Sequence, residues 1–270
     1  MALRTKAVVL SIIFVFVFAL LQVIDLSEVW ALKQEITKAL IMTIVFFIGL
    51  YWVLGFKVRG IRFITILGYP SFIIFIQTLF IELIIFQNVA RITAKTASMG
   101  VLVIFAVSTY LLILTINILN VSHVKRIPLV QAAKAANFLY ALFSAYFAFL
   151  LILRSVIDDI PRIMLLVFVS FFITLSVFWF KRESLRQWLG ETLVVVFCLA
   201  TVFLIFMLWP LSVEVSGMFY IVVFYILLGL GLEERETTSL LMRIEYFLLI
   251  IFAIIFVLKF AVWGINGSIF

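Results

Sequence analysis

Glu82 is the residue with the clearest chemical potential, because it lies in the very apolar stretch IQTLFIELIIF. Ser71 and Thr78 precede it at spacings that place all three on one face of a helix. In hydrocarbon a charged side chain costs roughly 2.5–3.5 kcal/mol, so an acid there needs a partner or a path to water. Pro70 interrupts the same stretch, and Asn117 lies in the next apolar stretch. These residues are a candidate polar core for transport of protons or cations.

A second interpretation of Glu82 needs no transport. The carboxyl is then protonated, or it bonds to Asn117, and it only holds neighbouring helices together.

The segment RSVIDDIPR offers a weaker site for chemistry. Asp158 and Asp159 could hold a divalent cation, and Arg154 and Arg162 could bind a lipid phosphate. Adjacent residues of a helix point in directions about 100° apart, so this pair is a weaker signal than two acids on one face. The alternative is a helix end with a solvated, capping loop.

A run of small residues follows the loop VSHVKRIP. Small side chains on one helix face let a neighbouring backbone approach closely, which is how membrane helices associate. We therefore predict a helix-packing face made of Asn137, Ala141, Ser144, Ala145 and Ala148.

Other reactive side chains are few. His123 has no acid or nucleophile near it in sequence, and Cys198 is the single cysteine. We find no phosphate-binding glycine loop, HExxH or CxxC motif, so we expect no cofactor and no metal. Lys259, near the end of the last apolar run, is expected to extend its amine to an interface.

The composition explains what must position these residues. Of the 270 residues, 67% are hydrophobic and 12% are charged, and the mean hydropathy is +1.37. A soluble domain carries about 25% charged residues, so the medium around most of this chain must be lipid. The net charge of +7 lies in short gaps between apolar runs, which favours lipid headgroups over nucleic acid as the partner.

The apolar runs are each long enough to cross a hydrocarbon core of about 30 Å as a helix. We predict an all-α integral membrane protein, a bundle of about nine transmembrane helices forming one domain over residues 1–270. The eighth run is the shortest and least secure. The predicted spans are 7–25, 37–55, 65–86, 98–120, 135–153, 163–180, 191–210, 216–232 and 242–263.

Basic residues predict the orientation of these spans. Thirteen Lys and Arg residues lie at the N-terminus and in every second gap, and six lie in the other gaps. Positive loops stay in the cytoplasm, so we expect a cytoplasmic N-terminus and an outer C-terminus.

Three functions fit this pattern. A non-catalytic integral subunit or scaffold of a complex in the cell (inner or plasma) membrane needs only helix packing, and it would contact the bilayer and other membrane subunits or copies of itself. A small transporter or channel would use Glu82. A membrane-embedded lipid-phosphate enzyme would use Asp158 and Asp159. The sequence favours them in that order.

Overall fold

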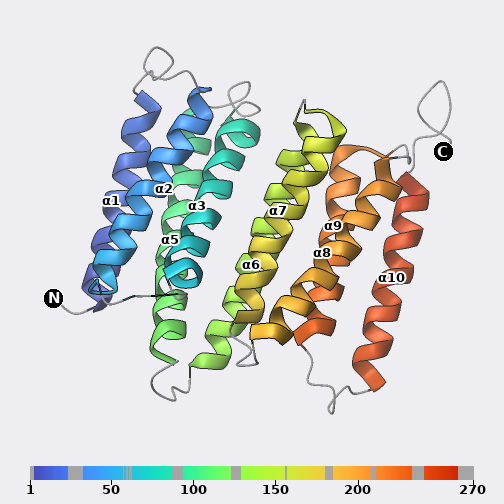
Figure 1. The fold of residues 1–270 in the computed structure, drawn as a ribbon. Helices are drawn as coiled ribbons and strands as arrows, with labels where there is room; N and C mark the ends of the chain where they lie inside the picture. The colour runs from blue at the N-terminus through green and yellow to red at the C-terminus, as the bar shows by residue number, and fades with distance from the viewer. Residues whose placement is uncertain are drawn as a thin grey trace. The chain divides into compact units, whose positions relative to one another are not determined.

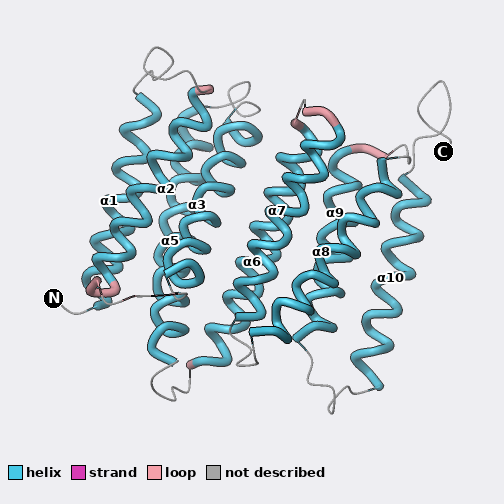
Figure 2. The backbone as a smooth tube through the Cα atoms, in the orientation of Figure 1, coloured by secondary structure: helices cyan, strands magenta, loops and turns pink. Residues whose placement is uncertain are grey.

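The computed structural model describes the helices and a few flanking residues. These are residues 3–23, 33–56, 58, 60, 63–86, 94–122, 129–155, 157–179, 185–207, 211–232 and 240–260. Within these ranges the chain is helical apart from turns and short connecting residues, and no strand occurs (Figure 2). This agrees with the predicted all-α class, because a backbone in lipid must satisfy its own hydrogen bonds.

The helices follow the apolar runs closely. In chain order they are α1 (Leu3–Val23), α2 (Gln34–Val53), η1 (Phe63–Gly68), α3 (Tyr69–Phe80), η2 (Ile81–Phe86), α5 (Ala94–Ser122), α6 (Val130–Arg154), α7 (Asp159–Phe178), α8 (Leu185–Met207), α9 (Val213–Leu232) and α10 (Leu240–Phe260).

Eight of these helical segments are long and apolar enough to cross a membrane. They include the doubted eighth run, since α9 begins three residues earlier than predicted and spans 20 residues. In α10 only the shorter segment Ile244–Phe256 is apolar enough among the described residues. The fold is therefore that of a multi-pass membrane protein.

The third predicted span is one continuous helix with three parts. The π-helical turns η1 and η2 flank the α-helical segment α3. Pro70 lies in the first turn of α3, immediately after η1 ends at Gly68. The expected break at Pro70 is therefore absent, because the wider π turn accommodates a residue that has no N–H to donate.

The helices cluster into two compact units, Met1–Tyr140 and Ala141–Phe270, with the division inside α6. In the first unit α1 packs against both α2 and α5, and α2 packs against α3 (Figure 1). Phe14 contacts Phe46 of α2 and Phe105 of α5, with ring centroids 5.6 and 5.3 Å apart. Aromatic side chains from three helices thus contribute to the core of this unit.

In the second unit α8 packs against both α7 and α9, and α9 also packs against α10 (Figure 1). The later part of α6 contacts α9, where the Phe149 ring lies 5.8 Å from the Tyr220 ring. Gly217 makes this contact close, since a Cβ placed on it would lie 2.7 Å from a methyl carbon of Leu150. A small residue at this position of α9 lets the two helices approach.

Candidate functional site

The strongest candidate site lies in the first unit, around Glu82 in η2. The side chain is buried, with 6% of its surface exposed. The amide Nε2 of Gln22 in α1 donates a hydrogen bond to Oε1 of Glu82 at 2.5 Å. The ammonium Nζ of Lys38 in α2 lies 3.7 Å from Oε2. We call Gln22, Lys38 and Glu82 the Glu82 cluster; it joins three helices.

The packing of α1 against α2 explains why Gln22 and Lys38 meet. The two helices are antiparallel, so residues late in α1 lie beside residues early in α2. Phe14 contacts Phe46, and further along the amine of Lys6 lies 5.2 Å from the centre of the Trp52 ring. The same register brings Gln22, near the end of α1, level with Lys38, near the start of α2.

Opposite charge makes the burial of Glu82 tolerable. The ammonium of Lys38 compensates the carboxylate, and the Gln22 amide supplies a hydrogen bond to one of its oxygens. The Lys38 and Glu82 side chains are only 9% and 6% exposed, so solvent screens their attraction weakly. Such a pair adds little net stability over an apolar pair, but removing one partner leaves an uncompensated charge.

The other members of the predicted polar core do not bind Glu82. Ser71 is buried and donates instead to the carbonyl oxygen of Leu67, one turn earlier, at 2.8 Å. Asn117 is half-buried near the end of α5. In Figure 1, α5 runs antiparallel to α1. Phe105 contacts Phe18 and Phe14, so Asn117, further along α5, lies near the level of Arg4. At 1.5 Å per residue this is about 27 Å from the level of Gln22, so the expected bond between Asn117 and Glu82 is wrong.

Two oxygens close to Glu82 along the helix have no hydrogen-bond partner among the described residues. They are Oγ1 of Thr78, which is fully buried, and Oε1 of Gln77, which is 6% exposed as a residue. Several other hydroxyls in the described helices bond to a carbonyl one turn earlier, as that of Thr109 does to Phe105. The segment that carries Glu82 therefore contains two buried oxygens that could each accept a hydrogen bond.

The predicted helix-packing face lies on α6, and all of its residues are buried. Ala141, Ser144 and Ala145 have no exposed surface, and Asn137 and Ala148 are 2% and 3% exposed. Large side chains occupy the opposite side, where Leu139 and Phe143 are more than half exposed. Oγ of Ser144 and Oδ1 of Asn137 have no hydrogen-bond partner among the described residues.

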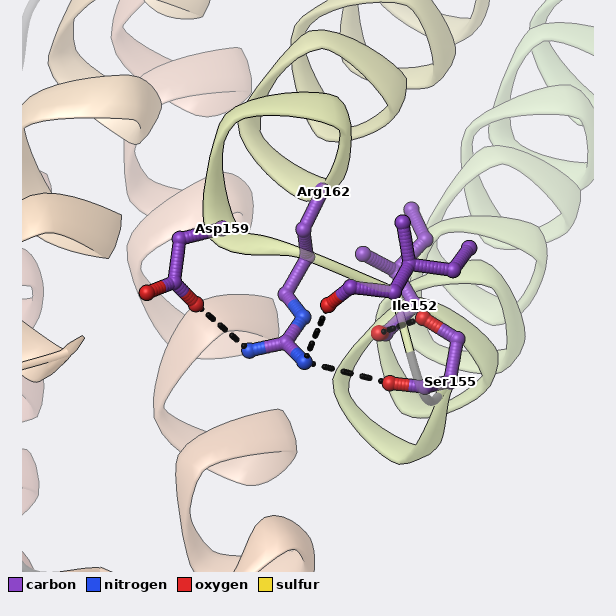
Figure 3. Close-up of polar contacts among 5 residues, drawn as sticks. Ile152, Ser155, Asp159 and Arg162 are labelled. Atoms are coloured by element: carbon purple, nitrogen blue, oxygen red, sulfur yellow. Dashed lines mark hydrogen bonds and ion pairs between the residues drawn. The ribbon is translucent and has the colours of Figure 1, made fainter.

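The loop between α6 and α7 holds the predicted phosphate or cation site. Arg162 donates from Nη1 to Asp159 at 3.1 Å, and from Nη2 to the carbonyl oxygens of Ser155 and Ile157 (Figure 3). Arg154 pairs with Glu214 of α9 at 2.6 Å. Asp158 is exposed, precedes α7 and makes no capping bond through its side chain.

These contacts use both arginines for internal bonds that tie the loop to the ends of α6, α7 and α9. Only two acids are adjacent there, and one of them already pairs with Arg162. Within the described residues, no group of three or more His, Cys, Asp or Glu side chains could hold a metal ion. The geometry favours a structural role for the loop.

The remaining reactive residues lie apart from the Glu82 cluster. Lys259 is exposed near the end of α10, and Cys198 is a partly exposed free thiol in α8. His123 lies outside the described residues.

Comparisons with protein-family models, with curated proteins and with solved structures find no match to this chain.

Sequence reasoning missed Lys38 and Gln22 as partners of Glu82. The sequence did contain a signal for Lys38, because Lys38 is a charged residue just inside the second predicted span, which is antiparallel to the third. Charged residues near the same end of two adjacent spans lie at the same depth. Gln22 gave no such signal, because an uncharged amide near the end of a span is ordinary.

Proposed function

We propose that the protein is a non-catalytic integral subunit or scaffold of a complex in the cell membrane. In this proposal the chain crosses the membrane nine times, with α10 as the last span and the N-terminus in the cytoplasm. The bilayer and other membrane subunits, or further copies of the chain, are its partners.

One observation carries the proposal: the buried acid is satisfied from within the chain. Glu82 receives a compensating charge from Lys38 and a hydrogen bond from Gln22. A site prepared for a substrate or an ion presents polar groups to a cavity. An open groove between α1 and α5 of this unit, lined by residues such as Val8 and Tyr110, contains no member of the Glu82 cluster. The arrangement therefore supports a joint between helices.

Purification of the tagged chain from its native membranes in a mild detergent tests this proposal. We expect a complex of fixed composition, larger than the chain alone, in size-exclusion chromatography with light scattering and mass spectrometry. The double variant Lys38→Met with Glu82→Gln removes both charges and should keep the same complex. Isolation of the wild-type chain as a lone monomer would contradict the proposal.

A second candidate, a proton- or cation-coupled carrier, has one observation in its favour. Thr78 and Gln77 carry buried oxygens without partners close to Glu82, and such oxygens could bind a water or an ion. Proteoliposomes with an imposed pH gradient and an enclosed pH-sensitive dye test this. A carrier should dissipate the gradient, and Glu82→Gln should stop it, whereas Glu35→Gln in the first turn of α2 should not. Equal rates for all three proteins would exclude proton coupling through Glu82.

The lipid-phosphate enzyme receives the least support. A phosphate would have to displace Asp159 from Arg162 and Glu214 from Arg154 before it could bind both guanidinium groups. Titration with a soluble lipid-phosphate analogue would detect such displacement.

A further inference from the structure

An open apolar groove lies between α1 and α5 on the first unit. Its volume is about 580 Å³. Several of its lining residues are strongly exposed, among them Ile12 and Phe16 of α1 and Val107 of α5. The lining consists of Val8, Ser11, Ile12, Val15, Phe16, Ala19, Ala106, Val107 and Tyr110. Small side chains from both helices, Ala19 and Ala106, lie among them.

The dimensions of the groove fit one hydrocarbon chain. The α1 residues from Val8 to Ala19 extend over about 17 Å at 1.5 Å per residue. A single leaflet of the membrane contributes about half of the 30 Å hydrocarbon core, so the groove is as long as one acyl chain.

A positive charge lies at one end of the groove. Arg4 is exposed and precedes Val8 by one helical turn, so it continues the row of α1 residues that line the groove. It lies in the first turn of α1, which contains no acidic residue. A cation there opposes the positive end of the helix dipole, and a bound anion would relieve both. Lys6 differs from Arg4, because its amine lies over the Trp52 ring.

We propose that this groove binds an anionic phospholipid, with one acyl chain between α1 and α5 and the headgroup phosphate at Arg4. The apolar lining selects hydrocarbon, the length selects a chain of one leaflet, and the guanidinium selects a negative headgroup. The site is separate from the Glu82 cluster, and it does not depend on the function proposed above.

Native mass spectrometry of the full purified chain, incubated with phosphatidylglycerol or phosphatidylcholine vesicles, tests this site. The wild type should retain one phosphatidylglycerol in preference to phosphatidylcholine. Arg4→Gln should reduce that preference about fivefold, the effect of one basic residue at a membrane surface. Lys33→Gln, an exposed basic residue just before α2, is the matched control and should change nothing.

Filling the groove tests the acyl chain separately. Ala106→Leu and Ala19→Leu should each abolish the retained lipid, whereas Ala135→Leu, at an exposed alanine of α6, should not. Circular dichroism and size exclusion identify which variants fold, and either groove variant suffices. Retention of the lipid by a folded groove variant would overturn the proposal. Equal binding of both lipids by the wild type, or an unchanged preference in Arg4→Gln, would overturn it as well.

Discussion

Replacing Lys38 by methionine should destabilise the protein far more than its single lost contact suggests. The variant keeps an unbranched side chain that is one atom shorter, and it leaves the Glu82 carboxylate without a compensating charge. Two charges 3.7 Å apart attract by about 4.5 kcal/mol at an effective dielectric constant of about 20. Removal of one partner of a buried pair typically costs about 3–5 kcal/mol. We expect a loss at the lower end of this range, about 3 kcal/mol, because the pair lies near the ends of its helices.

The assay is reversible unfolding in mixed micelles of mild detergent and dodecyl sulfate, followed by circular dichroism. Lys33→Met is the matched control, since it removes the same charge from an exposed position close to the same helix. It should change the free energy of unfolding by less than about 0.5 kcal/mol. The double variant Lys38→Met with Glu82→Gln should recover most of the loss, because neither charge remains.

If Lys38→Met and Lys33→Met lose equal stability at neutral pH, the pair is screened like a surface pair. Burial would then add nothing to the cost of breaking the pair, contrary to our prediction.

Three further predictions concern packing and topology. Ala141→Leu should lower the melting temperature by overpacking the buried face of α6, whereas Ala135→Leu on the exposed side should not. Equal melting temperatures for the two variants would contradict the burial of that face. Gly217→Ala should lower the free energy of unfolding by about 1–2 kcal/mol, because the added Cβ meets Leu150, whereas Gly190→Ala should raise it by up to about 1 kcal/mol, because no atom lies near. Changes of the same sign in the two variants would refute this. Reporter enzymes fused after Lys57 and after the C-terminal residue should report opposite sides of the membrane, and activity on one side for both would refute nine spans.

The helices could be predicted well because lipid imposes one simple condition on them. A run of about 20 apolar residues has to close its own backbone hydrogen bonds, and only a helix does so. The same condition places α9, although the eighth run was predicted to begin only at Ser216, two residues after Glu214. The structure begins the helix at Val213, since an acid in the first turn is favoured by the helix dipole.

The partner of Glu82 could be predicted only in part. Successive spans alternate in direction, so the position of a residue within its span fixes its depth in the membrane. This rule places Lys38 level with Glu82 and places Asn117 near the opposite end of the spans. The depth of each residue could therefore be predicted from the sequence. The rotation of each helix about its axis could not, because α2 has large apolar residues on its exposed and buried sides alike, such as Ile44 and Phe46. Gln22 could be identified as a donor only from the packed helices.

The position of the Glu82 cluster along the helices bears on its role. Glu82 lies about 6 Å from the end of the third span at Phe86, and about 11 Å from its middle. Gln22 and Lys38 are similarly close to the ends of α1 and α2. Substrate and coupling-ion sites of transporters lie near the middle of the bilayer, where alternating access can reach them from both sides. Near a helix end the cost of burying charges is smaller, and a bonded acid, amine and amide fix where three helices meet. The depth of the cluster thus favours a joint within a subunit over a transport site.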